Sequence, residues 1–120
     1  MKKVLVADDK ETGRELVRTV LENTGYDVIE ATNGTEALDC ARREHPDLII
    51  LDLHMPSLDG FGVIQELRRD ESFATTPVIA LTASAMMGDR ERALSLGFTG
   101  YITKPIWLSA LRGEVARLLA

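Results

Sequence analysis

An uninterrupted apolar run, Leu48–Leu51, ends directly in an aspartate, Asp52, near the middle of the chain. Four apolar residues in a row, two of them β-branched, are typical of a strand that is buried on both faces. An ionised carboxylate at the end of such a strand is costly unless water, a cation or hydrogen bonds meet it. Pro56 and Gly60 then mark a loop before a new helical pattern. Taken alone, Asp52 would be interpreted as a solvated turn residue; the rest of the chain favours a functional site.

The same alternation of strand and helix continues along the whole sequence. Strands are expected over 4–7, 27–30, 48–51, 78–81 and 100–103, and helices over about 11–24, 35–44, 61–69, 85–96 and 106–119. Repeated strand–helix units with short connections predict a parallel sheet that is covered by helices on both faces. We therefore predict one α/β domain over residues 1–120: a doubly wound, flavodoxin-like, five-stranded parallel sheet in the order 2-1-3-4-5 with five helices. The half-polar strand 27–30 is expected at an edge.

Apolar stripes predict which helix faces are buried. The first helix is expected to bury four residues, Leu16, Val17, Val20 and Leu21. The last helix is expected to bury Leu108, Leu111, Val115 and Leu118.

Composition and charge exclude several classes of protein. The net charge is −5, from 14 Lys and Arg against 19 Asp and Glu, which argues against direct binding of nucleic acid. Cys40 is the single cysteine, so the chain cannot form an internal disulfide. No apolar segment approaches the roughly 20 residues of a membrane span. We expect a cytoplasmic protein that binds neither nucleic acid nor membrane.

Polar residues follow four of the predicted strands. Asp8 and Asp9 follow the first, Asp52 the third, Thr82 the fourth and Lys104 the fifth. Ligands of open α/β sheets bind beyond the carboxyl ends of the strands, where the winding reverses. Three carboxylates held close together there require either a raised pKa or a bound cation. Their hard oxygen ligands favour Mg²⁺.

This combination of groups is suited to phosphoryl transfer onto an aspartate. A carboxylate can act as the nucleophile, while a metal ion and a lysine neutralise the charge on the phosphoryl oxygens. The hydroxyl of Thr82 can hold one of those oxygens. Each element alone is weak evidence, but together, at successive strand ends, they form a specific pattern.

The chain resembles the receiver domain of two-component response regulators, of the single-domain chemotaxis or cell-cycle type. The resemblance extends over nearly the whole chain. It is carried by Val4–Asp9, Asp52-Leu53-His54-Met55-Pro56 with Gly60, Leu81-Thr82-Ala83 and Gly100–Ile106.

The resemblance implies a role for each motif residue. Asp52 would accept a phosphoryl group from the phosphohistidine of a sensor histidine kinase or a histidine phosphotransfer protein. The Mg²⁺ site would consist of Asp8, Asp9, Asp52 and the backbone carbonyl of His54, with Asp8 acting mainly through water. Lys104 would pair with the phosphoryl group, and Leu53 and Ala83 would contact it through their backbones. Thr82 and Tyr101 would be the switch residues, and the peptide bond before Pro105 would be cis.

The same resemblance implies a signalling role, without a dedicated enzyme activity beyond the receiver's own phosphorylation and dephosphorylation. A downstream protein would bind the face formed by the helix 85–96, the strand 100–103 and the helix 106–119. Met86, Met87, Tyr101 and Trp107 are the residues of this face that are suited to contact with a partner. A phosphorylation-dependent homodimer is a further alternative.

Three other functions remain open from the residues alone. An aspartate-nucleophile Mg²⁺ phosphatase shares the chemistry, but it usually places its nucleophile after the first strand, where this chain reads Asp8-Asp9-Lys10. A flavin-binding protein of this fold would need a phosphate loop of the opposite charge at that position. A degenerate receiver that only binds partners is disfavoured by the intact motif residues.

Overall fold

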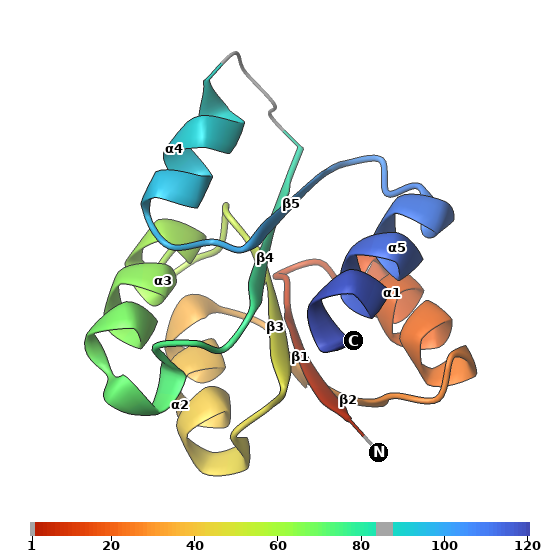
Figure 1. Cartoon of the computed structure of the whole chain (residues 1–120), viewed down its shortest axis with the longest axis horizontal. Coiled ribbons are helices and arrows are strands. Elements are labelled where there is room, and N and C mark those ends of the chain that lie inside the picture. Colours follow the sequence, from red (N-terminus) through yellow and green to blue (C-terminus); the bar gives the residue numbers. More distant parts are fainter. Residues whose placement is uncertain (1, 84–87) are drawn as a thin grey trace.

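The computed structural model describes residues 2–83 and 88–120, which form a parallel sheet between two layers of helices (Figure 1). The strands are β1 (Lys3–Ala7), β2 (Asp27–Ala31), β3 (Leu48–Asp52), β4 (Val78–Thr82) and β5 (Gly100–Thr103). The helices are α1 (Glu11–Asn23), α2 (Gly34–Glu44), α3 (Gly60–Arg69), a short 3₁₀ helix (Glu71–Phe73), α4 (Asp89–Ser95) and α5 (Leu108–Leu119).

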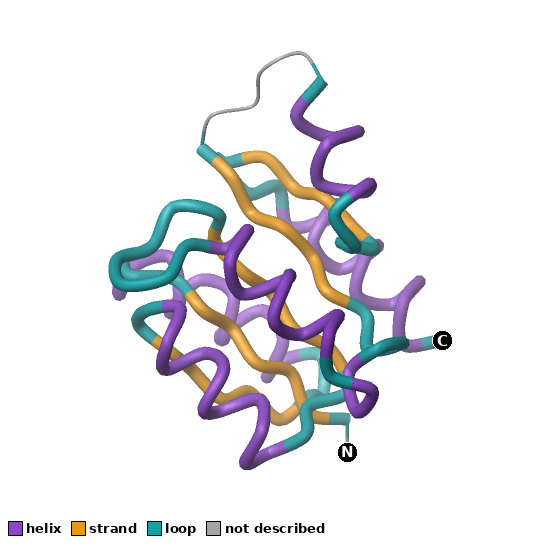
Figure 2. The backbone as a smooth tube through the Cα atoms, turned by 90° about the vertical axis from the view of Figure 1, so that its left-hand side faces the viewer, coloured by secondary structure: helices purple, strands orange, loops and turns teal. Residues whose placement is uncertain are grey.

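The sheet has the predicted topology. Its five strands are all parallel and lie in the order β2-β1-β3-β4-β5. The half-polar strand β2 lies at one edge, as predicted, and β5 lies at the other. Figure 2 shows the strands side by side, with helices in front of them and behind them. Since β1 and β3 are neighbours, the winding reverses between their carboxyl ends.

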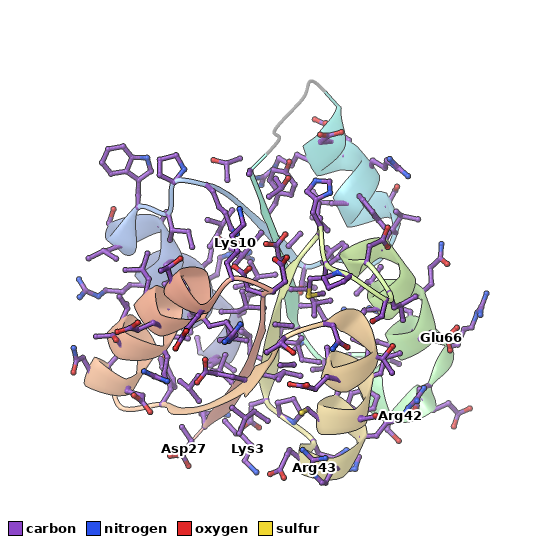
Figure 3. The ribbon with its side chains drawn as sticks, turned by 180° about the vertical axis from the view of Figure 1, so that it is seen from behind. Lys3, Lys10, Asp27, Arg42, Arg43 and Glu66 are labelled. Atoms are coloured by element: carbon purple, nitrogen blue, oxygen red, sulfur yellow. The ribbon has the colours of Figure 1, made fainter. Side chains whose placement is uncertain are left out.

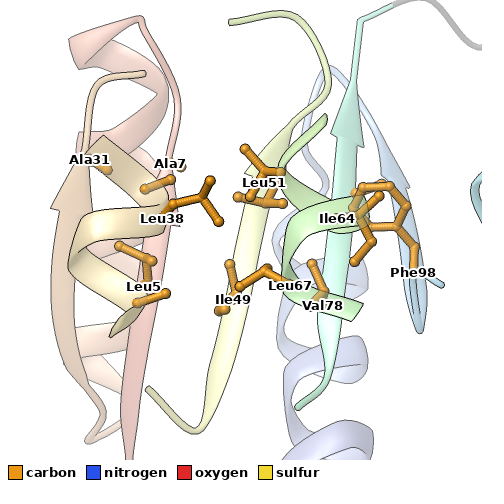
Figure 4. Close-up of a cluster of buried hydrophobic side chains, with 14 of the residues drawn as sticks. Leu5, Ala7, Ala31, Leu38, Ile49, Leu51, Ile64, Leu67, Val78 and Phe98 are labelled. Carbon is orange, nitrogen blue, oxygen red and sulfur yellow. The ribbon is translucent and has the colours of Figure 1, made fainter. Parts of the chain in front are cut away.

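The central strand is buried on both faces, which explains its apolar run. Ile49 and Leu51 pack into the core cluster that includes residues of α2 and α3 (Figure 4). Leu48 and Ile50 pack into the cluster on the opposite face, which includes residues of α1 and α5. Successive side chains of a strand point to opposite faces, so one four-residue segment contributes to both cores.

Several local predictions are wrong. Leu16 and Leu108 are 41% and 40% exposed, so neither belongs to the core. Leu16 lies at the edge of the α1 stripe, whose buried residues are Val17, Val20 and Leu21. The last helix begins at Leu108 rather than 106, because Trp107 has extended backbone dihedrals. The described part of the predicted helix 85–96 is helical from Asp89. Met86 and Met87 lie outside the described residues.

An arginine connects α3 to the turn between α4 and β5. The guanidinium of Arg68 donates two hydrogen bonds to the carbonyl of Gly97, at 3.0 and 2.8 Å, and a further bond to the carbonyl of Phe73. Gly97 has a φ of +111°, and a Cβ atom there would lie 2.9 Å from the Arg68 side chain. Burial lowers the pKa of Arg68 below its ordinary value. Among the described residues, no carboxylate lies within ion-pair distance of Arg68, so backbone carbonyls alone receive its charge.

Candidate functional site

The carboxyl ends of β1, β3 and β4 bring three polar side chains together. Asp8 follows β1, while Asp52 and Thr82 are the last residues of β3 and β4. All three are nearly inaccessible to solvent, with exposed fractions of 0%, 5% and 1%. Figure 3 labels Lys10 at this end of the sheet and Lys3 at the opposite end. Buried polar groups of this kind need partners, and the surrounding residues supply them.

Lys104 lies between the two buried carboxylates. Its Nζ atom is 2.9 Å from Oδ2 of Asp8 and 2.8 Å from Oδ2 of Asp52. The backbone N–H of Lys104 donates to the carbonyl of Thr82 at 2.7 Å, which fixes the chain directly after β5. The Lys104–Pro105 peptide bond is cis, as the resemblance implied. The ammonium group therefore bridges residues that lie 96 and 52 positions away in the sequence.

Two backbone amides complete the partners of the carboxylates. The N–H of Lys10 donates to Oδ1 of Asp8 at 3.0 Å, and the N–H of His54 donates to Oδ1 of Asp52 at 2.8 Å. The side chain of His54 is exposed. The phosphoryl contact of Leu53 stays a prediction; here its N–H donates to the carbonyl of Leu81 at 2.9 Å and continues the β3–β4 ladder. The next amide after Leu53 is that of His54, which donates to the Asp52 carboxylate.

These contacts set the ionisation of the site. Burial by itself raises the pKa of Asp8, but the amide of Lys10 and the ammonium of Lys104 together hold the pKa below its ordinary value. Burial likewise opposes the charge of Lys104, yet hydrogen bonds and attraction from Asp52 and Asp8 hold its pKa above the ordinary value. Asp8 and Lys104 are thus both charged at neutral pH.

The acidic cluster has the ligand geometry of a cation site. One carboxylate oxygen from each of Asp8, Asp9 and Asp52 lies within 4.8 Å of the other two. Asp9, unlike the other two, is exposed. With three carboxylates and one ammonium the cluster keeps an excess of negative charge. Hard oxygen ligands with an open, solvent-facing side are the donor set that Mg²⁺ takes in proteins, so these residues fit the predicted metal.

Two glycines allow the backbone to pack closely around the site. A Cβ atom on Gly60 would lie 2.8 Å from the carbonyl oxygen of Asp52. A Cβ atom on Gly13, in the first turn of α1, would overlap the carboxylate of Asp8. The sequence analysis missed Gly13. A glycine inside a helix costs about 1 kcal/mol relative to alanine, which was the available signal for a close contact.

The two predicted switch residues lie next to each other in the sheet but differ in surroundings. Tyr101 is paired with Ala80 on β4, two residues before Thr82. The ring of Tyr101 packs against the core cluster, and its hydroxyl is buried with no hydrogen-bond partner among the described residues. Burial raises the pKa of this phenol. Ala83 is exposed directly after Thr82.

A groove lies on the predicted output face. It has a volume of about 570 Å³ and is lined by residues of β5 and α5, together with Arg90 of α4. Trp107, at 73% exposure, and Tyr101 contribute its aromatic surface. A second, smaller groove of about 360 Å³ lies beside the site, between the start of α1 and the segment 104–106. No helix in the described part of the chain is both long and apolar enough to cross a membrane.

Comparison with known sequences identifies the family. The sequence model of the response regulator receiver domain matches residues 4–116. This chain belongs to the response regulator receiver family. The family assignment confirms the predicted resemblance, and it removes the phosphatase and the flavin-binding protein that the residues alone had left open.

Relatives of this receiver differ in length. It is 45% identical over 117 residues to a probable transcriptional regulator, ycf27, of Porphyridium aerugineum, a match that covers 98% of this chain and 48% of that protein. The receiver thus spans about half the length of that relative. It is 45% identical over 105 residues to the polar-differentiation response regulator DivK of Brucella ovis, with 88% of this chain and 85% of DivK covered.

A solved receiver structure supports the fold and the metal chemistry. The receiver domain of the sensor histidine kinase PA1611 from Pseudomonas aeruginosa superimposes with a TM-score of 0.90 at 32% identity, covering 98% of this chain and 97% of that one. That structure has a magnesium ion coordinated in its active-site cleft. The acidic cluster of this receiver is compatible with the same ion.

Proposed function

We propose that this receiver acts in phosphorelay signalling by accepting a phosphoryl group on Asp52 from the phosphohistidine of a sensor histidine kinase or a histidine phosphotransfer protein. The observation that carries the proposal is the position of Asp52 at the mouth of the sheet, where Lys104 and the amide of His54 each hold one carboxylate oxygen. These two contacts orient the Asp52 carboxylate, and the site faces solvent at the exposed Asp9. A cytoplasmic location is part of the proposal.

In the transfer, the P–N bond of the phosphohistidine breaks and its electron pair stays on the imidazole nitrogen. A bond forms between phosphorus and one carboxylate oxygen of Asp52. Lys104, which already lies 2.8 Å from Asp52, moves its ammonium toward the new phosphoryl oxygens. The amides of His54 and Ala83 would donate hydrogen bonds to the phosphoryl oxygens, and Thr82 would hold a third oxygen.

The metal of the proposal is Mg²⁺, held by Asp8, Asp9, Asp52 and the backbone carbonyl of His54. When bound, it would reduce the negative charge on the phosphoryl oxygens. Asp9 contributes the exposed carboxylate of the cluster. The same residues would serve the receiver's own dephosphorylation, in which water replaces the aspartate oxygen on phosphorus. No dedicated enzyme activity is proposed.

Incubation with acetyl phosphate and Mg²⁺, followed by intact mass spectrometry, tests this function. We expect a gain of one phosphoryl group, about 80 Da, on Asp52. Asp52→Asn should abolish the gain, and Asp9→Ala should reduce it strongly because the metal site is incomplete. Asp59→Asn is the matched control, because Asp59 caps α3 through the amide of Gly62 and should leave the gain intact. Phosphate found mainly on Ser57 or Asp59 would overturn the assignment.

We further propose that the output face consists of α4, β5 and α5, and that a downstream protein or a second phosphorylated copy binds there. The groove lined by Tyr101 and Trp107 supports this proposal. The phosphoryl group would attract the Thr82 hydroxyl, because charge-assisted hydrogen bonds are stronger than neutral ones. A shift of Thr82 would change the packing beside Tyr101 two positions earlier on the neighbouring strand.

Beryllofluoride with Mg²⁺, a phosphoryl mimic, tests the output face by NMR. We expect chemical-shift changes at Tyr101 and in α4 in addition to those around Asp52. Thr82→Ala should keep the changes around Asp52 and weaken those at Tyr101. Changes confined to the loops around Asp52 would show that this face is not the output.

A further inference from the structure

An arginine outside the acidic cluster, itself paired with a glutamate, holds the backbone of Asp8. Arg14, one turn into α1, donates from Nη1 to the carbonyl oxygen of Asp8 at 2.8 Å. The same guanidinium donates from Nε to Oε1 of Glu30 on β2 at 3.1 Å. The Arg14 side chain is only 13% exposed, so both contacts are made in a largely desolvated position. One rigid group therefore joins the edge strand to the peptide of a buried carboxylate.

The peptide of Asp8 is fixed from both sides. Its N–H donates to the carbonyl of Ala31, the last residue of β2, at 3.1 Å. Its carbonyl accepts from Arg14, whose own N–H donates to the carbonyl of Lys10 at 3.2 Å. The N–H of Lys10 in turn donates to the Asp8 carboxylate. These bonds define the turn that carries Asp8 and Asp9, and Arg14 is its only side-chain partner on the carbonyl side among the described residues.

We infer that Arg14, oriented by Glu30, is a positioning residue for the metal site: it sets the direction of the Asp8–Asp9 turn so that both carboxylates face Asp52. The inference rests on the proposed Mg²⁺-dependent phosphoryl transfer. Arg14 does not touch the carboxylates themselves. Its planar guanidinium supplies two donors in a fixed relation, which a lysine ammonium cannot reproduce.

The direction in which the loss of Arg14 changes Mg²⁺ affinity distinguishes a positioning role from a charge effect. A cation near the cluster repels Mg²⁺, so by charge alone the loss of Arg14 would strengthen metal binding. If Arg14 acts through the geometry of Asp8, its loss weakens metal binding instead. Partners that orient metal ligands typically change affinity by about 10- to 100-fold. Asp8 is one of several ligands, so we expect about tenfold.

Arg18 offers a matched control. It lies one turn further along α1 and also pairs with Glu30, through Nη1 and Oε2 at 2.8 Å. It carries the same charge and its other carboxylate partner is Glu22 at 3.8 Å. No hydrogen bond joins Arg18 to Asp8 in the described part of the chain. Arg18→Met therefore removes one cation and one Glu30 contact without changing the support of Asp8.

The experiment is a Mg²⁺ titration of the wild type, Arg14→Met, Arg14→Lys and Arg18→Met, followed by the NMR amide signals of Lys10 and His54. These amides donate to the carboxylates of Asp8 and Asp52 and so report metal binding without phosphorylation. Both Arg14 variants should bind Mg²⁺ about tenfold more weakly than the wild type, and Arg18→Met should bind as well as the wild type or slightly better. Thermal unfolding confirms that each variant is folded at the titration temperature.

Each other outcome overturns the inference. Arg14→Met that binds Mg²⁺ as tightly as the wild type shows that Asp8 needs no such support. Weaker binding in Arg14→Met with full affinity in Arg14→Lys shows that a single donor at this position is sufficient and that the two donors of the guanidinium are not required. Equal weakening in Arg18→Met assigns the effect to the ion-pair network as a whole. A wild type with no Mg²⁺ response at Lys10 or His54 removes the proposed metal site itself, and the inference with it.

Discussion

The acidic site at the carboxyl ends of the strands and the face formed by α4, β5 and α5 differ in how completely their polar groups are hydrogen-bonded. In the acidic site, each oxygen of the Asp8 and Asp52 carboxylates accepts a hydrogen bond, either from Lys104 or from a backbone amide. On the face, Tyr101 buries a hydroxyl that has no hydrogen-bond partner within residues 2–83 and 88–120, and Trp107 is 73% exposed. Helix α4 spans seven residues and begins after Gly88, which has no side chain that could cap it. The proposed phosphoryl chemistry thus uses groups that are held by hydrogen bonds, whereas the proposed output face carries an exposed Trp107 and a buried hydroxyl that is less completely partnered.

The largest expected effect comes from removing the ammonium that holds the two carboxylates. Lys104→Met leaves two buried negative charges without their common partner, so we expect the free energy of unfolding in metal-free buffer to fall by about 3 kcal/mol. Urea unfolding measures this change. Lys10→Met, at an exposed position beside the site, should change stability by less than about 0.5 kcal/mol. Equal losses of stability in the two variants would mean that the ion pairs of Lys104 contribute no more to stability than an exposed lysine side chain does.

The pH dependence of stability sharpens the same contrast. The lowered pKa of Asp8 stabilises the fold above its ordinary value of 3.8, and this contribution is lost as the pH falls through the folded-state pKa below 3.8. The raised pKa of Lys104 stabilises the fold below its ordinary value of 10.5, and this contribution is lost as the pH rises through the folded-state pKa above 10.5. Between these limits the two groups add no slope.

In Lys104→Met, the pH dependence of stability in the acidic range should reverse its sign. Burial, the largest influence on Asp8, then raises its pKa, so the variant should gain stability as the pH falls through this raised pKa toward the ordinary value of 3.8. Urea midpoints for the wild type and the variant across this range provide the measurement. Parallel curves for the two proteins would show that Lys104 does not control the ionisation of Asp8.

The smallest effect is expected on the output face. Tyr101→Phe removes a buried hydroxyl that has no hydrogen-bond partner among the described residues, so stability should stay constant or rise by up to about 1 kcal/mol. Differential scanning calorimetry is sensitive enough to detect this. Tyr26→Phe, at a partly buried position in the other core cluster, is the control. A loss of more than about 1 kcal/mol in Tyr101→Phe would mean that the hydroxyl is well partnered in solution.

Most of the fold could be predicted because each strand and helix has a clear local pattern. The apolar run 48–51 indicated the doubly buried central strand, and the half-polar strand 27–30 indicated the edge. The errors occur where two patterns compete. Leu16 is apolar at the border of a helix stripe, and periodicity alone cannot tell a border residue from a core residue. The start of α5 is set by the extended backbone of Trp107, and the residues directly after Pro105 show no helical spacing of apolar residues that would predict it.

The candidate site was predictable in its membership but less so in its contacts. The positions of Asp8, Asp52, Thr82 and Lys104 followed from strand order alone. Which amide would reach Asp52 depended on whether the β3–β4 ladder continued through Leu53, and it does. The sequence also gave no indication that Arg14 and Glu30 would meet across α1 and β2, because long-range ion pairs have no local periodicity.

The guanidinium of Arg68 has a consequence for how α4 can move. It fixes the carbonyl of Gly97, directly after the C-cap of α4, to α3 and to the end of the 3₁₀ helix. The other end of α4 begins after Gly88, a residue without a side chain. A helix held at one end behaves as a lever with its pivot at that end, so displacement grows along its length. Any rotation of α4 about this attachment would therefore displace its amino-terminal end more than the carboxyl-terminal end beside Gly97.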